Sequence, residues 1–233
     1  EDQSLAGSTL VNLDRLTPGD PDLATMADSA WTIRNITAQG WEYGYSAFSV
    51  SWYEGDAGPS DDWLITPAIE IGEDATLSWS AMAITSSGDY RDQYQVFVAN
   101  EGTIDDFALV APLYDTGSEG EIDEPQDRFI DLAAEGFENE TIYVAFRNWT
   151  QPYDPDEPTG PGNGGNELCI DNIRVEGPAT GIAENHDNFG AISIFPNPAT
   201  RGVVTLQFSL NTPDRLQMTV FDQTGRSVRT LDF

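Results

Sequence analysis

Short runs of apolar residues that alternate with polar ones recur along this chain, each bounded by Gly, Pro, Asp or Asn. No stretch of a dozen residues shows convincing helical periodicity. In the runs at 93–99 (QYQVFVA) and 141–147 (TIYVAFR), one face can bury Val, Phe and Tyr against an opposite sheet. The pattern predicts an all-β fold, a two-sheet jelly-roll β-sandwich. We expect its strands at 8–13, 30–36, 47–52, 63–65, 75–83, 93–99, 108–114, 128–131, 141–149 and 168–175.

The remainder of the chain reads as a polar linker and a second, smaller β unit. We assign 1–176 to the jelly roll, 177–191 to the linker and 192–233 to a partial immunoglobulin-like β-sandwich. Within the second unit, strands are expected at 192–195, 203–209 and 216–222. Three strands are too few for two closed sheets, so either the unit is incomplete or a partner supplies the missing strands.

Charge excludes one class of partner. The formal net charge is −30, from 40 acidic residues against ten basic ones, and all ten are Arg. Such a field repels nucleic acid, so no nucleic-acid partner is expected. Carboxylates without lysine favour an extracellular protein of a halophile, where salt screens self-repulsion, while an ordinary acidic secreted protein stays the alternative.

Catalytic groups are scarce in this composition. Cys169 is the only cysteine and lies in an apolar run, so it reads as a buried, inert thiol. His186 has no second histidine with which to build a triad or a zinc site. We therefore expect a protein that is not an enzyme. No run of about 18 apolar residues is present, so no membrane span is expected. Because Glu1 does not begin a signal peptide, we expect the chain to be a mature or trimmed form.

Ordered motifs carry a family resemblance: SDDWLITPAIEI at 60–71, TLSWSAMA at 76–83, YRDQYQVFVANEG at 90–102, DDF at 105–107, IYVAFRN at 142–148 and LCIDNIRV at 168–175. In this order they resemble the cleaved-adhesin or choice-of-anchor J family of Bacteroidetes-type surface proteins, which includes the gingipain adhesin domains. The resemblance implies a jelly roll with structural calcium, a role in cell adhesion and no chemistry of its own.

The tail from 191 to 228 is similar to the opening of the type nine secretion (type IX) C-terminal sorting domain, with its Pro-Asn-Pro turn and an Asp-x-x-Gly-Arg hairpin from Asp222 to Arg226. The later strands of that family are missing from this sequence. The resemblance implies a secreted or outer-cell-surface location, with secretion and attachment machinery as partners.

Calcium takes six to eight oxygens from Asp, Asn and carbonyl groups. The family resemblance places an ion where the first strand meets the last, which makes Asp14 and Asp171 the first candidates. Asn12 and Asn172 are adjacent candidates, and Asp62 precedes the strand at 63–65. A solvated surface or a turn cap is the alternative for each of them.

Aromatic residues in Gly- or Pro-flanked segments are the candidates for ligand binding. Trp41 and Tyr43 lie in WEYGY, and Trp149 and Tyr153 flank the loop 151–166 (QPYDPDEPTGPGNGGN). A sugar ring stacks on such side chains while polar groups take its hydroxyls. Core or edge packing is the alternative.

The leading functional hypothesis is an exported adhesin module that binds an extracellular glycan or a surface protein. One alternative is a structural subunit of an extracellular fibre or matrix, with self-association through the incomplete second unit. Another is an accessory module of a larger secreted hydrolase.

Overall fold

The computed structural model describes residues 5, 7–37, 44–84, 90–156, 164–177, 189–195, 205–210, 217–221 and 227–232. The chain divides into two compact units, Glu1–Ala179 and Thr180–Phe233. Among the described residues, no helix is both long and apolar enough to cross a membrane.

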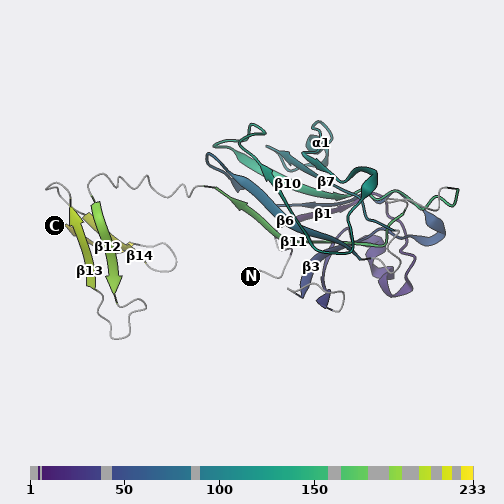
Figure 1. Ribbon diagram of the computed structural model, residues 1–233, viewed down its shortest axis with the longest axis horizontal. Coiled ribbons are helices and arrows are strands. Elements are labelled where there is room, and N and C mark those ends of the chain that lie inside the picture. Colours follow the sequence, from purple (N-terminus) through teal and green to yellow (C-terminus); the bar gives the residue numbers. More distant parts are fainter. Residues whose placement is uncertain are drawn as a thin grey trace. The chain divides into compact units, whose positions relative to one another are not determined.

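The first unit is a β-sandwich of two antiparallel sheets, as the sequence predicts (Figure 1). One sheet has the order β1 (Thr9–Asn12), β4 (Asp62–Ile65), β10 (Thr141–Asn148), β7 (Tyr94–Ala99) and β8 (Tyr114–Asp115), and β5 (Ile69–Glu70) also pairs with β10. The other has the order β2 (Thr32–Asn35), β3 (Tyr45–Val50), β11 (Glu167–Glu176), β6 (Thr76–Ile84) and β9 (Gln126–Asp131).

The inward faces of the two sheets form the main core. Trp79 of β6 is 1 % exposed, and its ring packs edge-on against Phe146 with centroids 5.7 Å apart. Its Nε1 donates to the hydroxyl of Tyr94 at 3.0 Å, so the indole is buried with its polar group satisfied. Cys169 is also fully buried, as expected.

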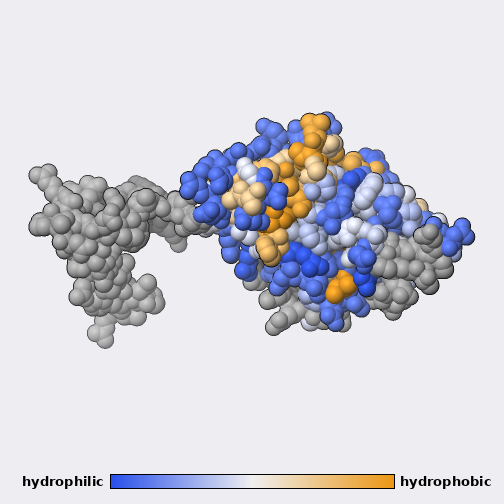
Figure 2. All heavy atoms as spheres, turned by 45° about the horizontal axis from the view of Figure 1, so that its top comes forward, coloured by the Kyte–Doolittle hydropathy of each residue, from blue (hydrophilic) through white to orange (hydrophobic). Residues whose placement is uncertain are grey.

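A smaller cluster covers the outer face of the β1–β4–β10–β7 sheet. The short helix α1 (Ile104–Phe107) buries Phe107 there, with centroids 5.9 Å from Trp63 and 6.3 Å from Phe97. Just beyond α1, Leu109 and Val110 are exposed. On the face turned forward in Figure 2, apolar residues gather in a band surrounded by hydrophilic ones.

The strand predicted at 108–114 is wrong. Thr103 caps α1 by accepting a hydrogen bond from the amide of Asp106, and the chain then turns with Leu109 84 % exposed. Pro112 has no N–H for a ladder bond, and pairing resumes only at Tyr114–Asp115 in β8. Three 3₁₀ turns, η1 (Pro21–Asp28), η3 (Glu54–Asp56) and η4 (Gly117–Glu119), and the short β5 were also not predicted.

The second unit contains two antiparallel pairs, β12 (Phe189–Phe195) with β13 (Thr205–Leu210), and β14 (Gln217–Phe221) with β15 (Ser227–Asp232). The sequence reading expected three strands here and missed β15. Most of the linker (178–188), including His186, and both turns that carry the sorting-domain motifs lie outside the described residues.

Candidate functional site

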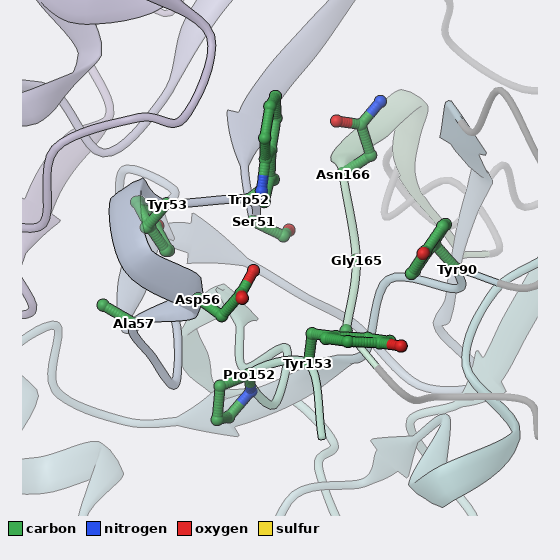
Figure 3. A pocket seen from close by; sticks show the side chains of 11 residues that line it. Ser51, Trp52, Tyr53, Asp56, Ala57, Tyr90, Pro152, Tyr153, Gly165 and Asn166 are labelled. Atoms are coloured by element: carbon green, nitrogen blue, oxygen red, sulfur yellow. The ribbon is translucent and has the colours of Figure 1, made fainter. Parts of the chain in front are cut away.

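A cavity of about 370 Å³ opens where three chain segments meet beside the end of β3. Residues 51–57 follow β3, Tyr90 precedes β7, and residues 152–153 and 164–166 are the two described ends of the loop between β10 and β11. We call this the loop cavity. Figure 3 shows Trp52, Tyr90 and Tyr153 around it, with the carboxylate of Asp56 pointing into the space between.

Backbone contacts fix the segments that form the loop cavity. The amides of Ser51 and Trp52 both donate to the carbonyl of Asn166, at 2.8 and 3.3 Å. A Cβ on Gly165 would lie 2.5 Å from Thr150 Cγ2 and 2.6 Å from Asp92 Oδ1. Only glycine therefore allows this segment to pass so close to the underlying side chains.

The aromatic side chains of the loop cavity stand apart from the main core. Tyr90 and Tyr153 pack edge to face, with centroids 5.9 Å apart. Trp52 is 45 % exposed, and its ring lies against Gly19, where a Cβ would approach within 2.6 Å. One exposed and two half-buried rings next to a carboxylate, a hydroxyl and an amide have the composition of a site for a small polar ligand such as a sugar.

A buried polar network lies beneath this end of the sandwich. The Asn148 amide donates to the hydroxyls of Ser49 and Ser51, at 3.0 and 2.9 Å, and to the carbonyl of Val50 at 3.2 Å. Thr150 donates to Asn148 Oδ1 at 2.9 Å. The network joins β10 to β3 of the opposite sheet, so it holds the two sheets together where the loop cavity opens.

Asp92 lies in this layer, fully buried, and in the described part of the chain neither of its carboxylate oxygens has a well-oriented hydrogen-bond donor. Burial raises the pKa of Asp92 to about 7, and the nearby Ser51 hydroxyl and the backbone at 166–167 partly offset that rise. The carboxyl therefore titrates near neutral pH.

A second buried carboxylate, Asp62, lies at the start of β4. Burial, and next the charge of Asp14, raise the pKa of Asp62 to about 8. The Tyr53 hydroxyl lies 3.2 Å from Asp14 Oδ2 and 3.5 Å from Asp62 Oδ2, and burial raises the pKa of this phenol as well. Asp62 Oδ1 and the buried hydroxyl of Ser60 have no hydrogen-bond partner among the described residues.

The structure divides the five predicted metal ligands into two groups. Asn12 lies opposite Asp62 in the β1–β4 ladder, and Asp14 lies two residues further along the chain. Asp171 lies opposite Ser80 in the other sheet, and Asn172 donates to the Ser80 hydroxyl at 3.2 Å. The first strand pairs with β4 and not with β11, which is why Asp14 and Asp171 do not share a site.

The group around Asp62 consists of carboxylate and hydroxyl oxygens, which are the ligand types of a cation such as calcium. It offers the carboxylates of Asp14 and Asp62, and two buried oxygens there lack a hydrogen-bond partner within the described residues. Asp14 also accepts from the amides of Leu16 and Asp61, at 2.8 and 2.7 Å, so it caps a turn as well. In the part of the chain that the structure describes, no cluster of three or more Asp, Glu, His or Cys suited to a metal forms.

The predicted ligand-binding residues have different positions. Tyr153 lines the loop cavity, whereas Trp41 and Tyr43 lie outside the described residues. Trp149 is half-buried, and the Arg147 guanidinium stacks on its ring at 3.7 Å. Arg147 also forms a bidentate pair with Asp61, at 2.8 and 2.9 Å, so Trp149 belongs to a packed surface cluster.

Sequence reasoning missed Trp52, Tyr90 and Asp56 in the loop cavity. Trp52 ends the predicted strand 47–52, and Asp56 follows in a Glu-Gly-Asp turn, a position typical of a loop. Tyr90 follows Gly88-Asp89, which is also a sequence typical of a loop. These turn signals mark loop ends, but nothing in the sequence indicates that the three loops meet.

No protein-family model and no curated protein matches this sequence. Among solved structures, the K1 cleaved adhesin domain of Lys-gingipain from Porphyromonas gingivalis superposes with a TM-score of 0.51 at 18 % identity, covering 76 % of this chain and 96 % of that chain. The K2 domain of Lys-gingipain gives 0.47 at 20 % identity, covering 74 % and 90 %. The likeness to K1 shows that the first unit has the fold of a cleaved adhesin domain.

Proposed function

We propose that the first unit is a non-catalytic binding module of a secreted or surface-attached protein, and that its loop cavity takes an extracellular glycan or a short segment of a surface protein. One observation carries this proposal: the exposed ring of Trp52, the half-buried rings of Tyr90 and Tyr153, and polar groups converge in a 370 Å³ cavity on loops of the sandwich. The shared fold with an adhesin domain supports it.

Two features of the described residues support the absence of chemistry. Burial raises the pKa of the Cys169 thiol to about 12, so the thiolate that a nucleophile requires does not form at neutral pH. The loop cavity itself contains Asp56, Tyr90 and Tyr153, and no histidine, lysine or arginine lies among its described lining residues. A constellation of nucleophile, base and orienting group is not assembled there.

The test is a binding screen of the whole chain against glycans and matrix proteins at high salt. A hit is then measured by calorimetry with Tyr153→Ala and Trp52→Ala, and with Tyr45→Ala as the matched control, because Tyr45 is an exposed aromatic outside the cavity. We expect each cavity variant to weaken binding about ten-fold or more and the control to bind as wild type. Equal binding by all three variants would place the site elsewhere. Absence of any hit together with concentration-dependent assembly would favour the structural subunit.

Calcium is the cofactor that we propose for the group around Asp14 and Asp62. Bound there, the ion would neutralise two adjacent carboxylates and hold the segment after β1 against the start of β4. Asp171 and Asn172 are not part of this proposal, because β11 lies in the other sheet.

The prediction for calcium concerns stability. Calcium at a hundred-fold excess over its Kd should add about 2.7 kcal/mol to the unfolding free energy, and Asp62→Asn should abolish the gain. Thermal melts in calcium and in EDTA measure it, with the exposed Asp123→Asn as control. A gain that survives Asp62→Asn but disappears in Asp171→Asn would contradict the assignment.

We further propose that the second unit directs export by a type nine route, on the basis of the sequence motifs from 191 to 228. The antiparallel pairs β12–β13 and β14–β15 are compatible with the β unit that such a signal requires. A reporter fused to residues 177–233 should reach the medium or cell surface of a type nine-competent host. Retention of the reporter in the periplasm would overturn this assignment.

A further inference from the structure

A second cavity, of about 360 Å³, lies on the β6–β9–β11 sheet of the first unit. Its lining comes from residues 78–80 of β6, 127–129 of β9, and Asn172 and Arg174 of β11. Because Trp79 points into the core, the flanking Ser78 and Ser80 point to the outer face. We call this cavity the sheet groove. It is formed by strands of the sheet, whereas the loop cavity is formed by loops.

The sheet groove carries an aromatic ring and a cation in one row. Ser78 pairs with Phe129 on one side and with Arg174 on the other. At about 4.8 Å between neighbouring strands, Phe129 and Arg174 are roughly 10 Å apart at the backbone. Phe129 is 76 % exposed, which is unusual for an aromatic residue in the middle of a strand.

The next row of the sheet groove is a hydrogen-bonded set of polar groups. Ser80 donates to Asp127 Oδ1 at 2.8 Å, and the Asn172 amide donates to the Ser80 hydroxyl at 3.2 Å. Asn172 has a φ of 52° at the bulge where the register between β11 and β6 shifts, and the bulge turns its amide toward the groove. Among the described residues, Asp127 Oδ2 and Asn172 Oδ1 accept no hydrogen bond and can take hydroxyl donors from a ligand.

Arg174 is the arginine of the sheet groove that has no carboxylate partner among the described residues. Three described arginines, Arg34, Arg128 and Arg147, form ion pairs with carboxylates. Arg174 is exposed and has no ion pair within the described residues, although the chain has 40 acidic residues. A guanidinium accepts a carboxylate in bidentate geometry.

We propose that the sheet groove binds an acidic saccharide, with a uronate ring stacked on Phe129 and its carboxylate on Arg174. Asp127 and Asn172 accept hydrogen bonds from the ring hydroxyls, and Ser78 lies between the two anchors. Stacking on one face and polar groups at the rim are the contacts that sugars require. This site is additional to the loop cavity, and it does not depend on what the loop cavity binds.

The experiment is a calorimetric titration of the full chain with a trisaccharide of galacturonic acid and with the matching galactose trisaccharide. We expect the acidic trisaccharide to bind about ten-fold or more tightly than the neutral one. Arg174→Gln should remove that preference, and Phe129→Ala should weaken both sugars about ten-fold, whereas Phe129→Tyr should bind as wild type.

The control is Arg15→Gln, because Arg15 is a second exposed arginine without an ion pair among the described residues and lies outside the groove. The proposal is overturned if the wild type binds no acidic trisaccharide, if both sugars bind equally, or if Arg15→Gln loses as much affinity as Arg174→Gln. Tyr153→Ala should leave this titration unchanged, which separates it from the test of the loop cavity. Thermal melts of each variant check that the fold is intact.

Discussion

At the scale of single residues, two buried aspartates of the sandwich have strongly raised pKa values. Asp92 and Asp62 are almost fully buried, and both have carboxylate oxygens without hydrogen-bond partners among the residues that the structure describes. Burial favours the neutral carboxylic acid, which is why both pKa values rise. A proton or a cation relieves the same electrostatic cost. Asp14 next to Asp62 makes a cation the more effective of the two at that position.

Asp92 should make stability depend on pH. Its pKa is about 7 in the folded protein against an ordinary value of 3.8, so the folded state binds more protons between these values. The stabilisation that Asp92 gives to the folded state is therefore fully present below about pH 4 and is lost as the pH rises through 7. The free energy of unfolding falls by up to about 4 kcal/mol over this range. Urea unfolding in EDTA at pH 5 and pH 8 should show a smaller change in Asp92→Asn than in wild type. Asp123→Asn should behave as wild type, and an unchanged pH dependence in Asp92→Asn would refute this assignment.

At the scale of elements, the alternating runs were sufficient to predict the long strands, since burial of one face against an opposite sheet leaves a period-two record. β6, β7, β10 and β11 were each predicted within two residues. The segment after α1 was not, because its apolar residues Leu109 and Val110 look like a strand but are exposed. In that segment, capping by Thr103 and the missing N–H of Pro112 outweighed the hydrophobic pattern.

The candidate sites were less predictable, because they depend on which elements meet. Tyr153 could be proposed from its Pro- and Gly-rich loop, since such loops end at the rim of a sandwich. The contact of that loop with the segment carrying Trp52 depends on the pairing of β11 with β3, which no local signal encodes. The same holds for Asp14, whose partner is set by the pairing of β1 with β4.

The α1 segment should stabilise the sandwich through one side chain. Phe107 is fully buried against Trp63 and Phe97, so Phe107→Ala should lower the unfolding free energy by about 3–5 kcal/mol. Leu109→Ala is the matched control, because that side chain is 84 % exposed and its loss should change stability by less than about 0.5 kcal/mol. Denaturant unfolding measures both. Equal effects of the two substitutions would show that α1 does not seal the outer face.

At the scale of the whole molecule, charge is the dominant property. A net charge of −30 on 233 residues produces self-repulsion that every compact state must overcome. Only three ion pairs form among the described residues, so most carboxylates are hydrated and not neutralised by the protein. Stability therefore depends on the ionic strength of the solvent as well as on internal contacts.

Sodium chloride should raise the melting temperature. The Debye length falls from about 10 Å at 0.1 M to about 3 Å at 1 M, so repulsion between surface carboxylates is screened over this range. We expect the midpoint of thermal unfolding to rise by several degrees, with most of the gain below 1 M sodium chloride, in melts recorded with EDTA. Sucrose at matched osmolality serves as control for general exclusion effects. A midpoint that is flat or falls with salt would contradict the electrostatic account.

The loop between Thr150 and Glu167 joins two strands, β10 and β11, that lie in different sheets and are held in place by their neighbours. Its carboxyl-terminal end is fixed by the contacts of Gly165 and Asn166, while the described residues 151–156 at its start are exposed or half-buried. Insertions, deletions and substitutions within this loop can therefore accumulate without unfolding the protein. Such a loop can be exchanged between relatives, or grafted in the laboratory, so that new recognition evolves on an unchanged scaffold.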